Sequence, residues 1–445
     1  MYNDSSIVPP VELRLQIFHA SPLGALFRAI PFEALACEIP PPPRALSGKG
    51  CRPWFDVRGG IALQILKSYY RCSDAQLIEL LNGNYQMQWF CGMDLKADEH
   101  IKDKGIVSRW RTYLGKHLDM DRLQIRLVQH WRPYMEHPHS SFCDATMYES
   151  YITYPSDAKL LWRSIQNVYE MIQGLRKQAR LRRSRIRHDK RKARYLSFAR
   201  KRKKTKRENK GVCKWLLPYL ERLVKQLEEL QQKYHTSLSL SHARRLSTIY
   251  TLKAQQQQLY VEGQPKVPNR IVSLHKPYVR PIIRGKEVKP VEFGVKANLL
   301  QVDGINFIEH VSYDNFNEGT RLKSTIRLQR RYFGACYQMG ADAIYATNEN
   351  RRYCTKHHIA TSFVPKGKEG KLVEQKSKMR SILAKVRATV LEGSFGNEKN
   401  HYLLNQINAR TQANEKVWLF FSMLTANAKQ IARRMQTVEK QKQAA

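Results

Sequence analysis

The sequence has no apolar run that approaches the about 18–20 residues of a membrane-spanning helix. Its best apolar run, Val417 to Leu424, is short and flanked by charged residues. The first ten residues contain an acidic residue and no basic segment ahead of an apolar core, so they do not match a secretory signal. We therefore expect neither a membrane-spanning protein nor one that carries such a signal.

Closely spaced cysteine pairs are also missing. The eight cysteines are irregularly spaced, and none forms a Cys-x-x-Cys pair. Zinc sites and disulfide frameworks depend on characteristic cysteine spacings, so neither is predicted. Reduced thiols are typical of proteins in a cytoplasm, and we expect a cytoplasmic protein.

Acidic residues are scarce relative to basic ones. The chain has 77 Lys and Arg against 38 Asp and Glu, which gives a formal net charge of +39. Charge of this size destabilises a compact fold through self-repulsion unless a polyanion neutralises it. Nucleic acid is the obvious polyanion, and an acidic membrane surface is the other candidate. With 42% hydrophobic and 10% aromatic residues over 445 positions, the chain has enough apolar surface for two or three domain cores.

The N-terminal part of the chain divides in two. Residues 1–50 are Pro-rich and are predicted to form an irregular lead-in with one short helix. Residues 51–135 carry apolar residues at helical spacing, and Ser73 with Gln76 three residues later matches a capping box. They predict a small helical domain that binds DNA or, in the blander alternative, only packs and dimerises.

A long basic helical insertion is predicted at 159–262. Its stretch 174–210 holds 19 Lys and Arg, and interspersed apolar residues favour a basic helix over a disordered tail. Apolar residues then recur at alternating spacings of four and three, at Leu216, Leu220, Leu223, Leu227, Leu230 and Tyr234. This stripe predicts a coiled-coil-like hairpin, with an ordinary helix packed on a core as the equal alternative.

β-Strand patterns occur on both sides of that insertion. Phe, Thr, Tyr and Ile alternate with polar residues at 140–154, and Val, Ile and Phe are frequent at 270–315. Helical and strand segments then alternate and end in two long helices. Together, residues 136–158 and 263–440 are predicted to form one mixed α/β layer, so the fold class is α+β or α/β with a helical N-terminal domain.

Three acidic residues lie in contexts that favour metal ligands. Phosphodiester chemistry on DNA can use two Mg²⁺ ions, and such hard cations prefer oxygen ligands held on rigid elements. Asp144 lies in a strand-like segment where an acid is otherwise disfavoured, Asp342 ends a short strand, and Glu392 lies on or next to a late helix. Each acid alone fits a surface carboxylate at least as well, so the prediction rests on all three.

Seven segments between residues 50 and 435 carry a family likeness. They are, in order, SDAQLIELLNGNYQMQWFCGMDL, VSRWRTYL, FCDATMYESYITYPSDAKLLW, RIVSLHKPYVRPIIRGKEVKPVEFGVK, QVDGINFIEHVSYDNFNEG, ADAIYATNENRRYC and LEGSFGNEKN. These segments resemble DDE transposases of bacterial insertion sequences, in the insertion-sequence-five-like group with a helical N-terminal domain. The last two motifs are fairly specific, and the ordered set is more so.

The resemblance implies a ribonuclease H-like catalytic core whose three acids bind two Mg²⁺ ions, for which Mn²⁺ can substitute. It also implies that Lys399, seven residues after Glu392, contacts the end of the DNA. The family often has an Arg four residues before this Glu. That position is Ala388 here, and Arg387 lies one residue further away.

Further site residues are predicted from the same segments and from the charge pattern. Asp303 and Asp157 are second-choice metal ligands, and Asp303 is preferred because a strand precedes it. The predicted DNA contacts are basic side chains: Lys399, Arg387, Arg109, Arg111, Arg182, Arg183, Arg185, Arg200, Lys201, Arg202, Lys203 and Lys204. Contacts from the basic helix would hold phosphates and carry no sequence information.

The reaction implied by the resemblance is transposition. A water hydrolyses one DNA strand at the element's end and frees a 3′-OH, which then attacks a phosphate of the target DNA. The implied partners are double-stranded DNA, as terminal inverted repeats and as target, and a second copy of the chain, because two ends must be paired. The implied setting is the DNA of a bacterial cytoplasm.

Three alternatives stay open. A tyrosine recombinase would need a His-x-x-Arg motif, which His188 and His242 begin, although such matches are expected by chance in so basic a region. A His-x-His nuclease would use His137 and His139, which flank a proline in a loop-like segment. A non-catalytic DNA-binding protein derived from a transposase would keep the fold without the chemistry.

Overall fold

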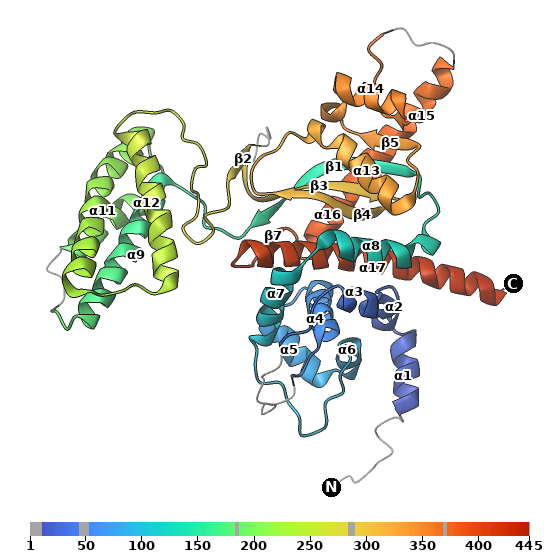
Figure 1. Ribbon diagram of the computed structural model, residues 1–445, viewed down its shortest axis with the longest axis horizontal. Coiled ribbons are helices and arrows are strands. Elements are labelled where there is room, and N and C mark those ends of the chain that lie inside the picture. Colours follow the sequence, from blue (N-terminus) through green and yellow to red (C-terminus); the bar gives the residue numbers. More distant parts are fainter. Residues whose placement is uncertain (1–10, 44–52, 183–186, 284–289, 368–371, 445) are drawn as a thin grey trace. The chain divides into compact units, whose positions relative to one another are not determined.

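The computed structural model of the chain describes residues 11–43, 53–182, 187–283, 290–367 and 372–444, with the elements labelled in Figure 1. These residues divide into two compact units. The first contains the described residues up to 150, together with 295–312 and 316 onwards; the second contains those of 151–294 and 313–315. No helix in the described ranges is both long and apolar enough to cross a membrane.

The N-terminal segment is helical rather than irregular. Its described part forms α1 (Val11–Ala20), α2 (Pro22–Arg28) and α3 (Phe32–Cys37). The prediction of an irregular lead-in with one short helix is therefore wrong for this part of the chain. Its prolines suggest loops, but Pro22 occupies the first turn of α2, and Ser21 caps that helix by accepting a hydrogen bond from the Gly24 N–H. Buried Leu26 and Leu35 help to hold these short helices in place.

Helices continue through the rest of the N-terminal region. They are α4 (Val57–Tyr70), α5 (Asp74–Gly83), α6 (Tyr85–Phe90), α7 (Ile106–His117) and α8 (Met120–Trp131), followed by a 3-10 turn at Arg132–Tyr134. The predicted capping box is confirmed, because Ser73 and Gln76 exchange side-chain and backbone hydrogen bonds at the start of α5. The helical character predicted for this region is confirmed with it.

The chain forms a mixed β-sheet. Its strands are β1 (Ser140–Ser150), β2 (Pro281–Ile283), β3 (Val291–Val302), β4 (Ile305–Ser312), β5 (Gln338–Ala341), β6 (Ala360–Thr361) and β7 (Gln406–Ile407). In the first unit the neighbours run β4, β3, β1, β5, β6, and β7 also pairs with β1. β3 and β4 are antiparallel, whereas β1, β5 and β6 are parallel. β2 pairs antiparallel with the first residues of β3, within the second unit.

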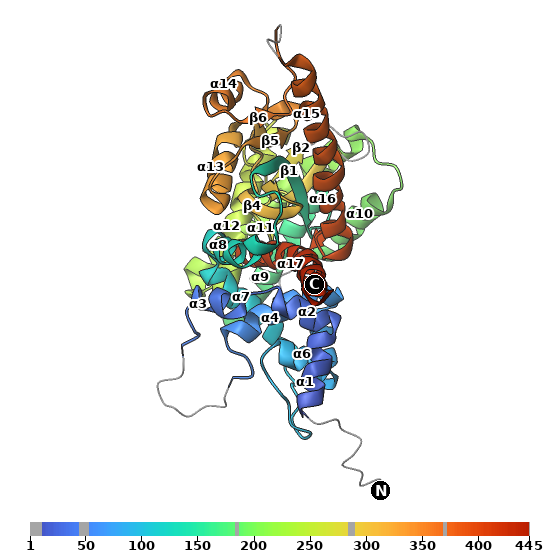
Figure 2. The same cartoon turned by 90° about the vertical axis from the view of Figure 1, so that its right-hand side faces the viewer.

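Helices cover both sides of the strands in the first unit. They are α13 (Leu322–Phe333), α14 (Asn348–Lys356), α15 (Val373–Val386), α16 (Glu392–His401) and α17 (Gln412–Ala444), with 3-10 turns at Glu318–Thr320 and Ala343–Tyr345 and a π-helical turn at Arg387–Leu391. Figure 2 shows α13 on one side of the strands and α15 with α16 on the other. The long α17 contacts β4 and β7 as well as α2, α4 and α7, so it joins the sheet to the N-terminal helices (Figure 1).

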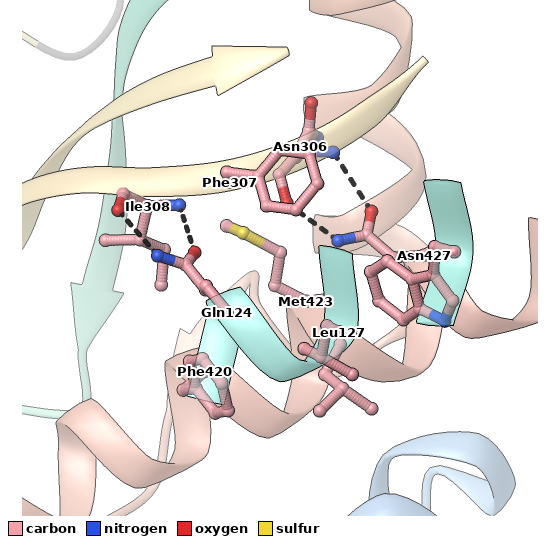
Figure 3. Close-up of a pocket in the computed structure, with 10 residues that line it drawn as sticks. Gln124, Leu127, Asn306, Phe307, Ile308, Phe420, Met423 and Asn427 are labelled. Atoms are coloured by element: carbon pink, nitrogen blue, oxygen red, sulfur yellow. Dashed lines mark hydrogen bonds between the residues drawn. The ribbon is translucent and has the colours of Figure 1, made fainter. Parts of the chain in front are cut away.

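Two side-chain amides cap the outer edge of β4 (Figure 3). Gln124 of α8 donates to the Ile308 carbonyl at 3.0 Å and accepts from the Ile308 N–H at 2.6 Å. Asn427 of α17 makes the same pair of hydrogen bonds with the Asn306 backbone, at 2.7 and 3.1 Å. The cavity beside these amides measures about 10 Å³, which is room for about one water. The amides thus replace a neighbouring strand and protect this edge from pairing with another chain.

The second unit is mainly a helical bundle. Its helices are α9 (Asp157–Gln178), α10 (His188–Arg200), α11 (Lys206–Tyr234) and α12 (Leu240–Tyr260). The leucines of the predicted stripe are buried on α11 in one core with side chains of α9 and α12, whereas Tyr234 is exposed. α10 attaches to this core through buried His188, Tyr195 and Phe198, and the His188 ring stacks on Tyr169 with centroids 3.9 Å apart.

Candidate active site

The three predicted acids lie on three elements of the first unit. Asp144 is within β1, Asp342 directly follows β5, and Glu392 is the first residue of α16. β1 and β5 are parallel neighbours in which Cys143 lies opposite Ala341. Asp144 and Asp342 therefore come at the next position on adjoining strands, so the register of the sheet brings these two acids together.

One guanidinium links all three carboxylates. Arg387 Nη1 lies 3.0 Å from Asp144 Oδ2 and 3.1 Å from Glu392 Oε1. Arg387 Nη2 lies 3.9 Å from Asp342 Oδ1. A cation among three carboxylates offsets their mutual repulsion. The structure thus places Arg387 on the acids, whereas the sequence predicted a contact with DNA.

A π-helical turn explains how Arg387 reaches Glu392. The turn covers Arg387–Leu391, and the Glu392 N–H donates to the carbonyl of Arg387, five residues back. Five residues along an α-helix correspond to about 140° around its axis, which would direct the two side chains away from each other. In a π turn, residues five apart lie one turn apart and on the same face. The spacing of five therefore serves here as a spacing of four does in an α-helix.

Asp144 is more buried than the other two acids. Its side chain is 16% exposed, against 53% for both Asp342 and Glu392. Burial raises the pKa of Asp144 to about 6, although the Ala145 N–H at 2.7 Å and the Arg387 guanidinium act to lower it. Asp342 accepts a hydrogen bond from the Ala343 N–H at 2.7 Å and caps the following 3-10 turn.

One face of β1 carries a row of polar contacts that begins at Asp144. Side chains two residues apart share a face of a strand, so Thr146 and Tyr148 follow Asp144 on this face. Lys399 of α16 donates to Thr146 Oγ1 at 3.0 Å, and its ammonium lies 5.6 Å from the centre of the Tyr148 ring. Glu392 and Lys399 are about two helical turns apart. Lys399 contacts Thr146 of β1 directly, whereas Glu392 is linked to Asp144 of β1 through Arg387.

Glu398 is a buried acid of this site that sequence reasoning missed. Its side chain accepts hydrogen bonds from Tyr148 Oη at 2.5 Å and from Asn306 Nδ2 at 2.6 Å. Burial raises the pKa of Glu398 to about 7, against the lowering effect of those two donors and of Lys399. In the sequence it stands between polar residues in GNEKN and looks like a surface acid. Only its position against β1 reveals it.

Neither second-choice metal ligand joins the acid cluster. The Asp157 carboxylate lies in the second unit and is bound by Arg270 at 2.6 Å, by Tyr260 Oη at 2.6 Å and by Gln256 at 3.0 Å. The Asp303 carboxylate accepts from Arg434 at 2.7 Å and from the Glu136 N–H at 2.9 Å. Both carboxylates therefore have structural partners, and none of these partners is Asp144, Asp342 or Glu392.

Arg111 is a structural residue and not an exposed DNA contact. Its side chain is 5% exposed and forms a two-pronged ion pair with Asp74, at 2.8 and 3.1 Å, and a hydrogen bond to Gln64 at 3.0 Å. All of its donor groups face the interior of the helical region, so the DNA-binding prediction for Arg111 is wrong. Arg109 on the same helix is exposed and ion-paired with Asp103.

The predicted basic surface of the second unit is exposed where it is described. The exposed side chains are Arg182, Arg200, Lys201, Arg202, Lys203 and Lys204. Arg183 and Arg185 lie outside the described residues. Lys201 forms an ion pair with Glu208 at 2.7 Å. The residues around Lys201 in the sequence are still mostly basic. By contrast, His188 of the possible recombinase motif is buried and shares a hydrogen bond with Tyr219 Oη, so it is unsuited to contact DNA.

A polar hollow of about 390 Å³ lies beside Lys399. Residues at the end of α4, in the last turn of α16 and in the segment after α16 line it: Tyr70, Arg71, Lys399, Asn400, Leu403 and Asn405. The hollow lies between the end of α4 and α16, the helix that carries Glu392. Two cationic side chains in one hollow suit an anionic ligand.

Two family models match the chain. One, described as a transposase domain (DUF772), matches residues 12–113, and the other, described as a transposase DDE domain, matches residues 339–427. These two matches support a DDE transposase of insertion sequences. The second match contains Asp342, Arg387, Glu392 and Lys399, whereas Asp144 lies outside both matched ranges. No curated protein and no solved structure is similar enough to this chain to match it.

The donor set of this site suits the divalent metal ions that DDE transposases generally use. Three carboxylates and no nitrogen or sulfur ligand favour a hard cation. The Arg387 guanidinium, bound among these acids, is a stand-in for such a cation. Among the described residues, no three or more His, Cys, Asp or Glu side chains are close enough to hold a metal ion as they stand. The acids therefore fit the metal by their chemistry, and the guanidinium lies between them.

Proposed function

We propose that this transposase cuts DNA at the ends of its insertion sequence and joins the freed 3′-OH ends to target DNA, using Asp144, Asp342 and Glu392. The observation that carries the proposal is the meeting of these three acids on Arg387, although β1, β5 and α16 lie far apart in the chain. Isolated surface carboxylates would have no reason to converge on one recessed cation. A convergent set of acids in a strongly basic protein suits phosphodiester chemistry.

We also propose that the sheet is a ribonuclease H-like core. In support, an antiparallel pair, β3 and β4, is followed across the sheet by parallel β1, β5 and β6. This topology places one acid inside the first strand and another at the end of its parallel neighbour. The residues of the helical second unit lie between these two acids in the chain, and β1 and β5 nevertheless pair side by side.

The three acids and Lys399 have different roles in the proposed reaction. Two Mg²⁺ ions held by the three acids would activate the attacking oxygen and neutralise charge at the phosphate. Lys399, fixed against Thr146, would hold a phosphate next to the acids. In the first step a water oxygen attacks the phosphorus and the 3′ oxygen leaves as a hydroxyl. In the second step that 3′-OH attacks a target phosphate and displaces another 3′ oxygen.

The partners follow from the charge and from the reaction. The exposed basic side chains around Lys201–Lys204 would bind the phosphates of double-stranded DNA without reading its sequence. Pairing two element ends requires two active sites, so we propose a homodimer on DNA. The free thiols of the seven described cysteines suit a bacterial cytoplasm.

Strand cleavage tests this function. The purified chain is incubated with DNA that carries the element's own ends, in Mg²⁺ or in EDTA, beside the Asp144→Asn and Glu392→Gln variants. Metal-dependent nicking at the ends is expected from the wild type, and both variants should bind DNA without cutting it. Cleavage that survives in both variants would overturn the assignment of these acids. Tight binding without cleavage in any metal would favour the non-catalytic alternative.

A further inference from the structure

Arg387 and Glu392 are connected twice. The Glu392 backbone N–H donates to the Arg387 carbonyl, and the Arg387 guanidinium donates to Glu392 Oε1 at 3.1 Å. The backbone bond is the i to i+5 bond of the π turn, so the same local geometry that widens the helix also brings the two side chains together. The guanidinium then extends to Asp144 on β1 and to Asp342 after β5.

In this geometry Arg387, and not its neighbour Ala388, lies on the same face as Glu392. Ala388 stands four residues before Glu392, at the position that would share its face in a regular α-helix. In the π turn the side chain of Ala388 is exposed, whereas Arg387 is 16% exposed and faces the acids. π turns cost hydrogen-bond quality and are frequent at functional sites, which suits a turn kept for the placement of one side chain.

We propose that Arg387 is a positioning residue that gathers the three carboxylates and competes with a divalent cation for their oxygens. This inference rests on the proposed function, because it concerns the same three acids. Arg387 Nη1 already engages Asp144 Oδ2 and Glu392 Oε1, so a metal ion bound by these acids needs oxygens that the guanidinium holds. Two cations at one cluster also repel each other. Metal binding therefore requires the guanidinium to move off the acids.

Binding of Mn²⁺ alone, without DNA, tests the competition. Mn²⁺ is titrated into the full-length chain, and the signal of free hydrated Mn²⁺ is followed by electron paramagnetic resonance. The decisive variant exchanges two neighbours, Arg387→Ala with Ala388→Arg, so composition and net charge stay constant while the guanidinium leaves its place. It should bind Mn²⁺ about tenfold more tightly than the wild type, because a charge-assisted hydrogen bond no longer opposes binding. Arg387→Gln should behave in the same way.

The result that overturns the inference is Mn²⁺ binding by the exchange variant that equals or is weaker than that of the wild type. If that variant does not fold, Arg387→Lys decides, since one ammonium cannot bridge three carboxylates as a planar fork does. It should bind Mn²⁺ several-fold more tightly, and unchanged affinity would reject the competition.

Two further variants separate this inference from the proposed function. Asp144→Asn and Asp342→Asn should each weaken Mn²⁺ binding. Unchanged binding in both would reject the metal site itself. Weakened binding in both, combined with a wild-type affinity in the Arg387 variants, would reject only the role of Arg387.

Discussion

The Tyr148 hydroxyl donates a hydrogen bond to the buried carboxyl of Glu398 at 2.5 Å. Tyr148 lies on β1 four residues after Asp144, and Glu398 lies on α16 six residues after Glu392. The pair therefore fixes the helix that carries one proposed catalytic acid to the strand that carries another. The pair also removes the Glu398 carboxyl from water, and this burial raises the pKa of Glu398 to about 7.

Replacing Glu398 with Gln should make folding stability less dependent on pH. The folded-state pKa of about 7 lies above the usual value of 4.5, so the protonated form is the one that folding favours. The associated stability is fully present below the unfolded pKa and is lost as pH rises through the folded pKa, by on the order of 2–3 kcal/mol. Urea unfolding at about pH 5 and about pH 8 measures this loss in the wild type and its absence in the variant.

A matched Glu→Gln control is Glu374, whose side chain is 81% exposed on α15. Glu374→Gln should leave the pH dependence of the wild type intact. An unchanged pH dependence in Glu398→Gln would show that this carboxyl does not titrate in the folded chain as its burial requires.

Replacing Arg111 with Leu should destabilise the chain by about 3 kcal/mol, because Asp74 would lose its two-pronged partner in a largely buried setting. Lys67 remains paired with Asp74 at 2.7 Å, which keeps the loss at the lower end of the range for buried pairs. Chemical unfolding measures the change. Arg109→Ala on the same helix is the exposed control and should change stability by less than about 1 kcal/mol.

The Arg111→Leu variant also tests whether Arg111 is a structural residue or a DNA contact. DNA affinity of Arg111→Leu, measured where the variant is fully folded, should equal that of the wild type. A stable Arg111 variant with weakened DNA binding would contradict the structural role.

Replacing Gln124 or Asn427 with Ala should each cost about 1–3 kcal/mol, because two backbone groups of β4 lose their partners in a buried setting. Exposing this edge should also promote association, since unpaired strand edges are templates for other chains. Unfolding and light scattering measure the two effects. Gln129→Ala, at an exposed position of α8, is the matched control, and an equal loss in it would argue against the capping role.

Neutralising the basic surface of the second unit should reduce the salt dependence of DNA binding. Replacing Lys201, Arg202, Lys203 and Lys204 with Gln should lower the slope of log affinity against log salt by about 0.9 for each phosphate that the variant no longer neutralises. Fluorescence anisotropy with duplex DNA at several salt concentrations gives the slope. The double variant Lys376→Gln with Lys378→Gln on α15 is a control for the removal of exposed charge elsewhere. An equal change of the slope in this control would contradict a special role of Lys201–Lys204 in DNA binding.

Local features were predictable because neighbouring residues decide them. The capping box at Ser73 and Gln76 is a short-range exchange of hydrogen bonds, and it formed as predicted. The leucine stripe of α11 follows from helical periodicity and is buried as a set. The three acids were identified by their strand and helix contexts together with a family resemblance, and the structure brings all three to one guanidinium.

Residues whose role depends on a distant partner were not predictable. Arg111 and Arg109 look alike in the sequence, yet one is buried on Asp74 and the other is exposed. Asp303 follows a strand as a catalytic acid would, but Arg434 from the end of the chain neutralises it. Charge and local pattern cannot distinguish such cases, because the partner comes from the fold.

The sequence by itself determined the helical and strand periodicities, the excess of basic charge and the order of the acidic motifs, since each depends on residues close in the chain. Only the tertiary structure decided which cation meets those acids. The π turn moves Arg387 onto the face of Glu392, and the register of β1 with β5 brings Asp144 beside Asp342. Backbone hydrogen bonding sets that turn and strand pairing across the fold sets that register, and neither is written in the spacing of residues.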